Sequence, residues 1–326
     1  MHYTQSEKME IIRLVESSEL SARATLKKMG LQPSTFYHWY DRYQQKGFDG
    51  LATQRRKKKP QWNQIPDDIR QQVVELALNH EDLSPRELAL KMTDEQGYYI
   101  SESSVYRILK KRGLIQIPTF VLNKAKDKFQ QPTSRVNEMW QTDFTYFKII
   151  GWGWYYLSTI LDDYSRFIVS WDLCKTMTTD DVENTITNAL VNSTVSQYQM
   201  PKLLSDNGSC YISGQLHDFL TQIGMSHVRG APSHPQTQGK IERYHRTMKS
   251  VIKLDNYYSP EELKFQLKEF VYYYNFQRYH ESLNNLTPSD VYYGRAESVL
   301  RKRKMTRTLT LKNRKMNYIM NQIANT

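Results

Sequence analysis

The sequence predicts all-α units in the N-terminal third and an α/β core with a mixed sheet flanked by helices after them. The chain has 326 residues, more than a single hydrophobic core usually holds. Up to about residue 113, apolar residues recur at helical spacing. From residue 139 onward, runs rich in β-branched and aromatic residues replace that pattern and later alternate with helical segments. We therefore expect at least two domains of different class.

Residues 1–50 predict three short helices. Thr4 and Glu7 have the spacing of a capping box, a second helix lies between Ser21 and Gly30, and a third opens at Pro33. A short helix, a glycine turn and a helix that starts with small polar residues are typical of a helix-turn-helix unit that binds DNA. The side chains expected to reach a DNA major groove are Ser34, Thr35, His38 and Arg42.

Residues 65–116 repeat this three-helix pattern. Ser84, Pro85 and Glu87 form a helix start, and a last helix runs from Ser101 to a basic end before Gly113. Either unit alone could be a small packing bundle, but two in tandem favour DNA recognition. The candidates for base contact in this second helix-turn-helix domain are Ser103, Tyr106 and Arg107. Residues 51–64, which include five successive cations, predict a basic linker, and residues 117–135 predict a polar connector.

Residues 136–295 predict an α/β core. Three strands in a meander are followed by alternating helix and strand, which is the ribonuclease-H-like order with five strands in a mixed sheet. The expected strands are 139–150, 154–161, 166–173, 202–205 and 225–228, with helices at 179–191 and 212–223.

Charge is distributed unevenly along the chain. The net charge is +11, whereas residues 135–295 hold 15 basic and 17 acidic residues. The basic C-terminal tail, residues 296–326, has eight basic and no acidic residue from position 301 onward. Basic flanks around a near-neutral core indicate phosphate-binding modules, although such runs also occur as solvated faces.

Several classes of protein are excluded by composition. No uncharged apolar run is long enough to span a membrane, and the N-terminus lacks the apolar region of a signal peptide. Cys174 and Cys210 are the only cysteines, too few for a disulfide framework or a four-cysteine zinc site. We expect a reduced cytoplasmic protein with no membrane partner.

Three acidic residues lie where acids are unusual or well placed for chemistry. Asp143 lies inside the first strand, Asp206 ends a short apolar strand, and Glu242 opens a helix. Three converging carboxylates favour a hard cation, and two Mg²⁺ or Mn²⁺ ions would suit phosphoryl transfer. Taken singly, Asp206 could serve a turn and Glu242 a helix start. Asp162 and Asp163 are interpreted as ordinary hairpin-turn residues.

Spacing adds a family resemblance to this interpretation. There are 35 residues between Asp206 and Glu242. The segment Pro232–Lys249, together with the motifs around Asp143 and Asp206, closely resembles the D,D(35)E signature of retroviral-type integrases and bacterial insertion-sequence transposases. The resemblance covers about residues 136–295.

The resemblance implies roles for single residues. Asp143, Asp206 and Glu242 would be catalytic and hold the metal ions, and Gln238, Arg246 and Lys249 would contact the DNA end. Arg246 and Lys249 follow Glu242 by four and seven positions, so a helix places all three on one face. Lys240 is a further candidate for DNA binding, with a solvated helix face as the alternative.

The sequence therefore predicts an insertion-sequence DDE transposase. It would bind terminal inverted repeats and target double-stranded DNA, and act as a homo-oligomer of at least two subunits. A retroelement integrase is an alternative, but the chain lacks the N-terminal zinc module of retroviral integrases because no cysteine precedes Cys174. A catalytically silent DNA-binding repressor or domesticated relic is the non-enzymatic alternative.

Overall fold

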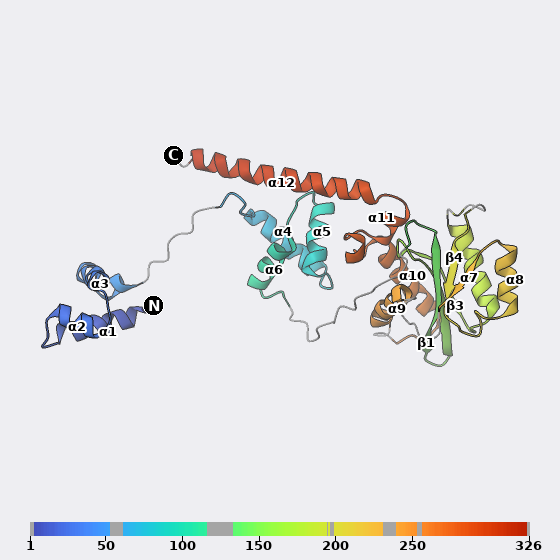
Figure 1. Ribbon diagram of the computed structural model, residues 1–326, viewed down its shortest axis with the longest axis horizontal. Helices are drawn as coiled ribbons and strands as arrows, with labels where there is room; N and C mark the ends of the chain where they lie inside the picture. Colours follow the sequence, from blue (N-terminus) through green and yellow to red (C-terminus); the bar gives the residue numbers. More distant parts are fainter. Residues whose placement is uncertain are drawn as a thin grey trace. The chain divides into compact units, whose positions relative to one another are not determined.

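The computed structural model describes residues 3–52, 61–115, 133–193, 195, 199–230, 239–252 and 256–324. The chain divides into two compact units, Met1–Gln61 and Trp62–Thr326 (Figure 1). The five cations of the predicted linker and most of the predicted connector lie outside the described residues.

The first unit consists of α1 (Gln5–Glu16), α2 (Ala22–Lys28), α3 (Pro33–Lys46) and the short 3-10 helix η1 (Gly47–Leu51). The predicted capping box is present, with the Thr4 N–H donating to the Glu7 carboxylate at 2.6 Å. Gly30 has a φ of +67°, a backbone conformation that suits glycine at the turn between α2 and α3. One apolar face of each helix forms a small core that includes Ile12, Leu26, Phe36 and Leu51.

The second unit begins with another three-helix group, α4 (Asp67–Asn79), α5 (Pro85–Asp94) and α6 (Glu102–Lys111). Ser84 and Glu87 form the expected capping box at the start of α5. Val73, Leu88, Met92 and Val105 lie in its core. These helices confirm the predicted all-α units in front of the core.

The sheet of the second unit has five strands in the order β3-β2-β1-β4-β5. β1 pairs antiparallel with β2 and parallel with β4, β2 pairs antiparallel with β3, and β4 pairs parallel with β5. This mixed order confirms the predicted ribonuclease-H-like fold class. The strands are β1 (Met139–Ile149), β2 (Gly153–Asp162), β3 (Ile168–Cys174), β4 (Lys202–Ser205) and β5 (His227–Arg229).

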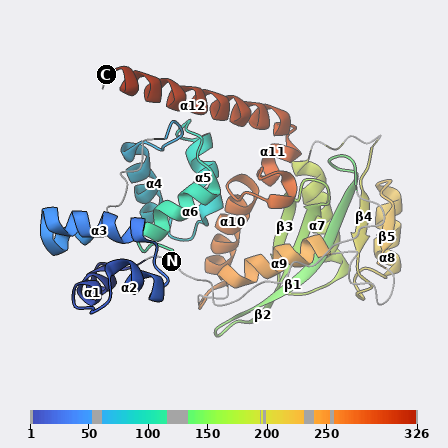
Figure 2. The same ribbon diagram turned by 60° about the vertical axis from the view of Figure 1, so that its left-hand side comes forward.

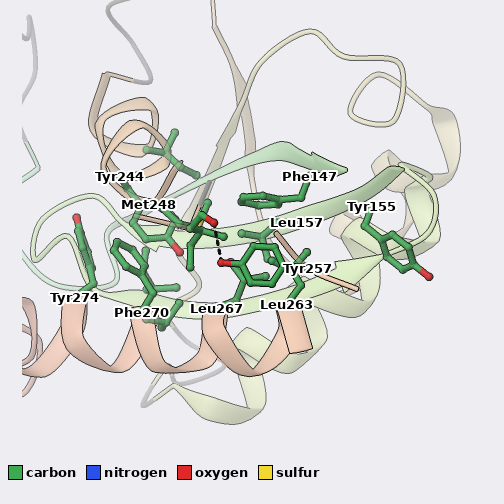
Figure 3. Packing of buried hydrophobic residues seen from close by; sticks show 14 of the residues in the cluster. Phe147, Tyr155, Leu157, Tyr244, Met248, Tyr257, Leu263, Leu267, Phe270 and Tyr274 are labelled. Atoms are coloured by element: carbon green, nitrogen blue, oxygen red, sulfur yellow. Dashed lines mark hydrogen bonds between the residues drawn. The ribbon is translucent and has the colours of Figure 1, made fainter. Parts of the chain in front are cut away.

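Helices cover both faces of the sheet (Figure 2). α7 (Thr179–Asn192) and α8 (Gly214–Gln222) pack on one face in a core that includes Trp140, Ile160 and Leu203. α9 (Gly239–Ile252) and α10 (Pro260–Phe276) pack on the other, where Phe147 and Leu157 meet Tyr244, Met248, Leu267 and Phe270 (Figure 3). Odd-numbered β1 residues such as Phe147 and Ile149 therefore face α9, because side chains alternate along a strand.

A short 3-10 helix, η3 (Glu281–Leu283), and α11 (Pro288–Tyr292) follow α10. The predicted basic tail then forms α12 (Ala296–Ala324), a helix of 29 residues. Arg303 of α12 forms two hydrogen bonds with the Asp94 carboxylate at the end of α5, at 2.8 and 2.6 Å. Thr310 accepts a hydrogen bond from the backbone of Tyr99. Since α12 contacts the second helix-turn-helix domain, this segment is a structural element as well as a basic one.

Among the described residues, no helix is both long enough and apolar enough to cross a membrane.

Candidate active site

Asp143 lies on β1 and faces α9. Its Oδ2 is 3.3 Å from Nδ1 of His245 on α9, and its side chain is 22% exposed. The buried neighbours Trp140 and Phe147 hold β1 in the sheet from its two faces. Asp143 is therefore a partly solvated carboxylate on a rigid strand.

Asp206 lies directly after β4, the strand that runs parallel to β1. Gln141 pairs with Leu204 in this ladder, and Asp143 and Asp206 each follow those partners by two residues. Because the two strands are neighbours and run in the same direction, Asp206, just beyond the end of β4, lies beside Asp143 on β1. We call this place, where β4 ends next to the middle of β1, the aspartate edge. Asp206 is exposed, and its Oδ1 accepts the Gly208 N–H at 2.8 Å, which holds the side chain in the turn after β4.

The buried Tyr211 lies near both aspartates. Burial raises the pKa of the Tyr211 hydroxyl well above its ordinary value, and the charges of Asp143 and Asp206 add to this effect. Burial also raises the pKa of the Cys210 thiol, again with contributions from both carboxylates. Both aspartates thus act on the same two side chains, which is consistent with one shared edge.

Glu242 lies in the first turn of α9 and is exposed. It precedes His245 by three positions, and residues at this spacing are neighbours on a helix surface. Because His245 touches Asp143, this face of α9 is directed toward the aspartate edge. Arg246 is also exposed, as expected from its spacing relative to Glu242.

The three carboxylates supply hard oxygen ligands of the kind that Mg²⁺ and Mn²⁺ prefer. In the described part of the chain, however, no three His, Cys, Asp or Glu side chains are close enough together to hold a metal ion. The donor chemistry fits, but binding of an ion by all three carboxylates requires them to move closer together.

The predicted DNA contacts around Glu242 have different environments. Lys249 is half-buried, and its Nζ lies 4.6 Å from the centroid of the Tyr146 ring, in a cation–π contact. Lys240 is only 8% exposed, and its Nζ forms an ion pair with Asp163 at 2.5 Å. Burial lowers the pKa of Lys240, and the charge of Asp163 opposes that shift. Lys240 is therefore a core residue in this structure, contrary to the expectation of an outward cation. Gln238 lies outside the described residues.

Most predicted base-reading side chains are exposed on their helices. Ser34, Thr35 and His38 lie on α3, and Ser103, Tyr106 and Arg107 lie on α6. Arg42 differs, because it is half-buried and its guanidinium donates to the Ala52 carbonyl at 2.8 Å. Arg107 also bonds within its helix, from Nε to the Ser103 carbonyl at 3.0 Å.

Sequence reasoning missed the buried polar residues behind the carboxylates. Asp162 and Asp163 lie at the end of β2 and in the turn after it, as expected, but they are 0% and 4% exposed, so they are core residues as well as turn residues. Burial raises the pKa of Asp162, and hydrogen bonds from Ser165 and Asn137 oppose this shift. His245 was missed as well. The available signal for His245 was its position one helical turn after Glu242.

Parts of the chain match models of known domain families. Residues 133–235 match the family model described as "Integrase core domain", and residues 223–288 match a second model with the same description. Together these two matches span residues 133–288. In front of them, residues 7–59 match a "Helix-turn-helix domain" and residues 35–109 a "Homeodomain-like domain".

Curated relatives of the integrase core and its flanks include transposases. The chain is 29% identical over 156 residues to "Putative transposase InsK for insertion sequence element IS150" of Escherichia coli, which covers 48% of this chain and 54% of that protein. It is 25% identical over 274 residues to "Transposase for transposon Tn552" of Staphylococcus aureus, covering 74% of this chain and 55% of that protein. The chain thus spans about half the length of these relatives. The predicted relationship to insertion-sequence transposases is confirmed.

A solved structure with a similar core is the HTLV-2 integrase catalytic core domain in complex with magnesium. It is 20% identical in sequence, with a TM-score of 0.39, and the match covers 48% of this chain and 97% of that one.

Proposed function

We propose that this protein is a DNA transposase of an insertion sequence. It would bind the terminal inverted repeats through its helix-turn-helix domains and carry out metal-dependent DNA cleavage and strand transfer in its core. The observation that carries this proposal is the placement of Asp143 and Asp206 two residues beyond one parallel β1–β4 pair, with α9 directed toward them through His245.

Each of the three carboxylates is held by a different kind of structural element. Asp143 is held by the central strand, Asp206 by a turn that its own Oδ1 stabilises, and Glu242 by a helix whose opposite face is buried against the sheet. The three carboxylates therefore come from two neighbouring strands and from a helix that packs on the same sheet. We propose that all three hold Mg²⁺ or Mn²⁺, with two ions per site, because hard cations prefer carboxylate oxygens and two ions suit phosphoryl transfer. The chemistry supplied by such ions is activation of the attacking oxygen and stabilisation of the leaving oxygen.

The chain's own cations would orient DNA beside this edge. Arg246 and Lys249 lie on the same face of α9 as Glu242, so phosphates held there would be next to the carboxylates. The exposed residues of α3 and α6 would contact base edges in the major groove. Since two element ends must be joined, we propose that the active form is a homo-oligomer on DNA, acting at the bacterial nucleoid in the cytoplasm.

The test is Mg²⁺-dependent strand transfer with duplex ends copied from the DNA that flanks the gene. Glu242→Gln removes one charge from the site with almost no change in shape. Glu269→Gln, on the exposed face of α10, is the matched control. We expect products from the unaltered protein and Glu269→Gln, and none from Glu242→Gln, with equal DNA-end binding by all three. Tight binding by all three without products in Mg²⁺ or Mn²⁺ would contradict the transposase assignment and favour a silent DNA-binding protein.

A further inference from the structure

A buried polar network joins the start of α9 to the central strands. Asp163, which follows β2, accepts hydrogen bonds from three side chains. These are Lys240 at 2.5 Å and Thr133 at 2.6 Å, both to Oδ2, and Gln141 at 2.7 Å to Oδ1. Lys240 also donates to the backbone carbonyl of Asp163 at 2.8 Å. Asp163, Gln141 and Lys240 are all buried, so this ion pair is shielded from water and fixed in direction.

Gln141 completes the connection to the helix backbone. Its Oε1 accepts the N–H of Ile241 at 3.1 Å, while its Nε2 donates to Asp163. The first four N–H groups of a helix have no partner within the helix. Gln141 therefore caps α9 from β1, and the Asp163 carboxylate lies where negative charge favours a helix start.

We propose that Lys240, Asp163 and Gln141 form a positioning unit that fixes the first turn of α9 on β1 and so sets the place of Glu242 relative to Asp143. The inference rests on the proposed function, because it assigns those two carboxylates to one site. Gln141 lies two residues before Asp143 on one strand, and Lys240 lies two residues before Glu242 on one helix. Gln141 and Lys240 are thus each joined to the carboxylate that they position by two residues of regular, rigid backbone.

Net stability alone does not account for such a pair. A buried ion pair is often no more stabilising than packed apolar groups of similar size, whereas removing one partner leaves an uncompensated charge. A stabilising role and a positioning role can therefore be separated by removing first one charge of the pair and then both. Lys240→Met keeps a side chain of similar length and leaves the Asp163 carboxylate without its positive partner. Lys240→Met with Asp163→Asn removes both charges, and the new amide keeps an oxygen for Gln141.

Three readouts are needed, namely the midpoint of chemical unfolding, hydrogen exchange at the Ile241 amide, and the single-turnover rate of strand transfer at saturating DNA. We expect Lys240→Met to lower the unfolding midpoint, speed exchange at Ile241 and slow strand transfer by about tenfold to 100-fold. In the double variant the unfolding midpoint should recover, while fast exchange and slow strand transfer persist. DNA-end affinity should stay within about threefold, since α9 keeps Arg246 and Lys249.

Lys264→Met is the matched control, because it removes an exposed lysine from α10 of the same α/β domain. Nζ of Lys264 lies 3.5 Å from Oδ1 of Asp172. The control should change none of the three readouts. Recovery of the strand-transfer rate together with the unfolding midpoint in the double variant would overturn the positioning role, as would unchanged exchange at Ile241 in Lys240→Met. If the unaltered protein shows no strand transfer at all, the proposed function fails, and the exchange at Ile241 still decides whether Lys240 positions α9.

Discussion

Nδ1 of His245 lies 3.3 Å from Oδ2 of Asp143, and this contact joins α9 to the central strand at the candidate active site. His245 is buried, and its ring packs against Tyr244, with the centroids 5.4 Å apart. Among the described residues, its Nε2 has no hydrogen-bond partner. The polar contact of this side chain is thus directed at Asp143, which makes His245 a neighbour that can orient the carboxylate.

His245→Phe should therefore separate packing from orientation. Phenylalanine keeps an aromatic ring beside Tyr244 but cannot contact the Asp143 carboxylate through a nitrogen. We expect the strand-transfer rate to fall by about tenfold, because small displacements of a reacting group are costly. The unfolding midpoint should change little, since the Asp143 carboxylate that loses this contact is partly exposed to water. A rate equal to that of the unaltered protein would show that Asp143 needs no support from α9.

Lys249 gives a prediction about DNA affinity. Its cation is held over the Tyr146 ring at 4.6 Å, on the Glu242 side of α9. Lys249→Ala should weaken DNA-end binding and reduce the dependence on salt by about one phosphate contact. Binding would be measured over a series of salt concentrations, with Lys268→Ala, an exposed change on α10, as the control. Parallel salt curves for Lys249→Ala and the unaltered protein would exclude a phosphate contact there.

Arg303 predicts how firmly α12 is attached. Its guanidinium binds both oxygens of Asp94 and donates to the Asn285 carbonyl at 2.9 Å. Burial lowers the pKa of Arg303, but the hydrogen bonds and charge of Asp94 outweigh it and raise the pKa overall. A lysine cannot reproduce this planar set of bonds, so Arg303→Lys should lower the free energy of unfolding by about 1–2 kcal/mol. Arg301 is exposed on the same helix, two residues before Arg303. Arg301→Lys is therefore the control and should leave the free energy of unfolding unchanged.

His280 predicts a pH dependence of stability in the core. Burial lowers the pKa of His280 to about 3, with the charges of Arg278, Arg166 and Arg86 adding to the shift. The unfolded chain, with its ordinary value of about 6.5, then binds the proton more readily. This stability is present in full above about pH 6.5, is lost as the pH falls below that value, and is gone near pH 3.

The expected loss from this group between pH 7 and pH 5.5 is about 1 kcal/mol. His280→Gln carries no titrating group and should lose that part of the slope, although its stability at pH 7 can differ. Chemical unfolding at both pH values checks this. Equal slopes for His280→Gln and the unaltered protein would mean that His280 is accessible to protons in the folded state.

Local signals in the sequence were sufficient for most elements. The capping boxes at Thr4 and Ser84 and the 3.6-residue periodicity placed the helices, because these features act within one or two turns. Runs rich in β-branched and aromatic residues placed the strands, and the meander predicted that β1, β2 and β3 are neighbours in the sheet. Among the candidate carboxylates, only Asp143 stood out by a local rule, because strands disfavour aspartate. Asp206 and Glu242 were selected by their spacing of 35 intervening residues and by the motifs around them.

The environment of each side chain on α9 depends on contacts that are far apart in the sequence. Lys240 is part of a basic helix segment and was a candidate for DNA binding, with a solvated helix face as the alternative. In the structure it is buried and pairs with Asp163, 77 residues earlier. His245 on α9 likewise contacts Asp143 on β1, although the two residues are far apart in the sequence. Helical spacing predicts which residues share a face, but it does not predict which face packs on the sheet. That depends on whether buried partners such as Gln141 and Asp163 can satisfy the polar groups, and those partners are assembled only when β1, β2 and α9 pack together.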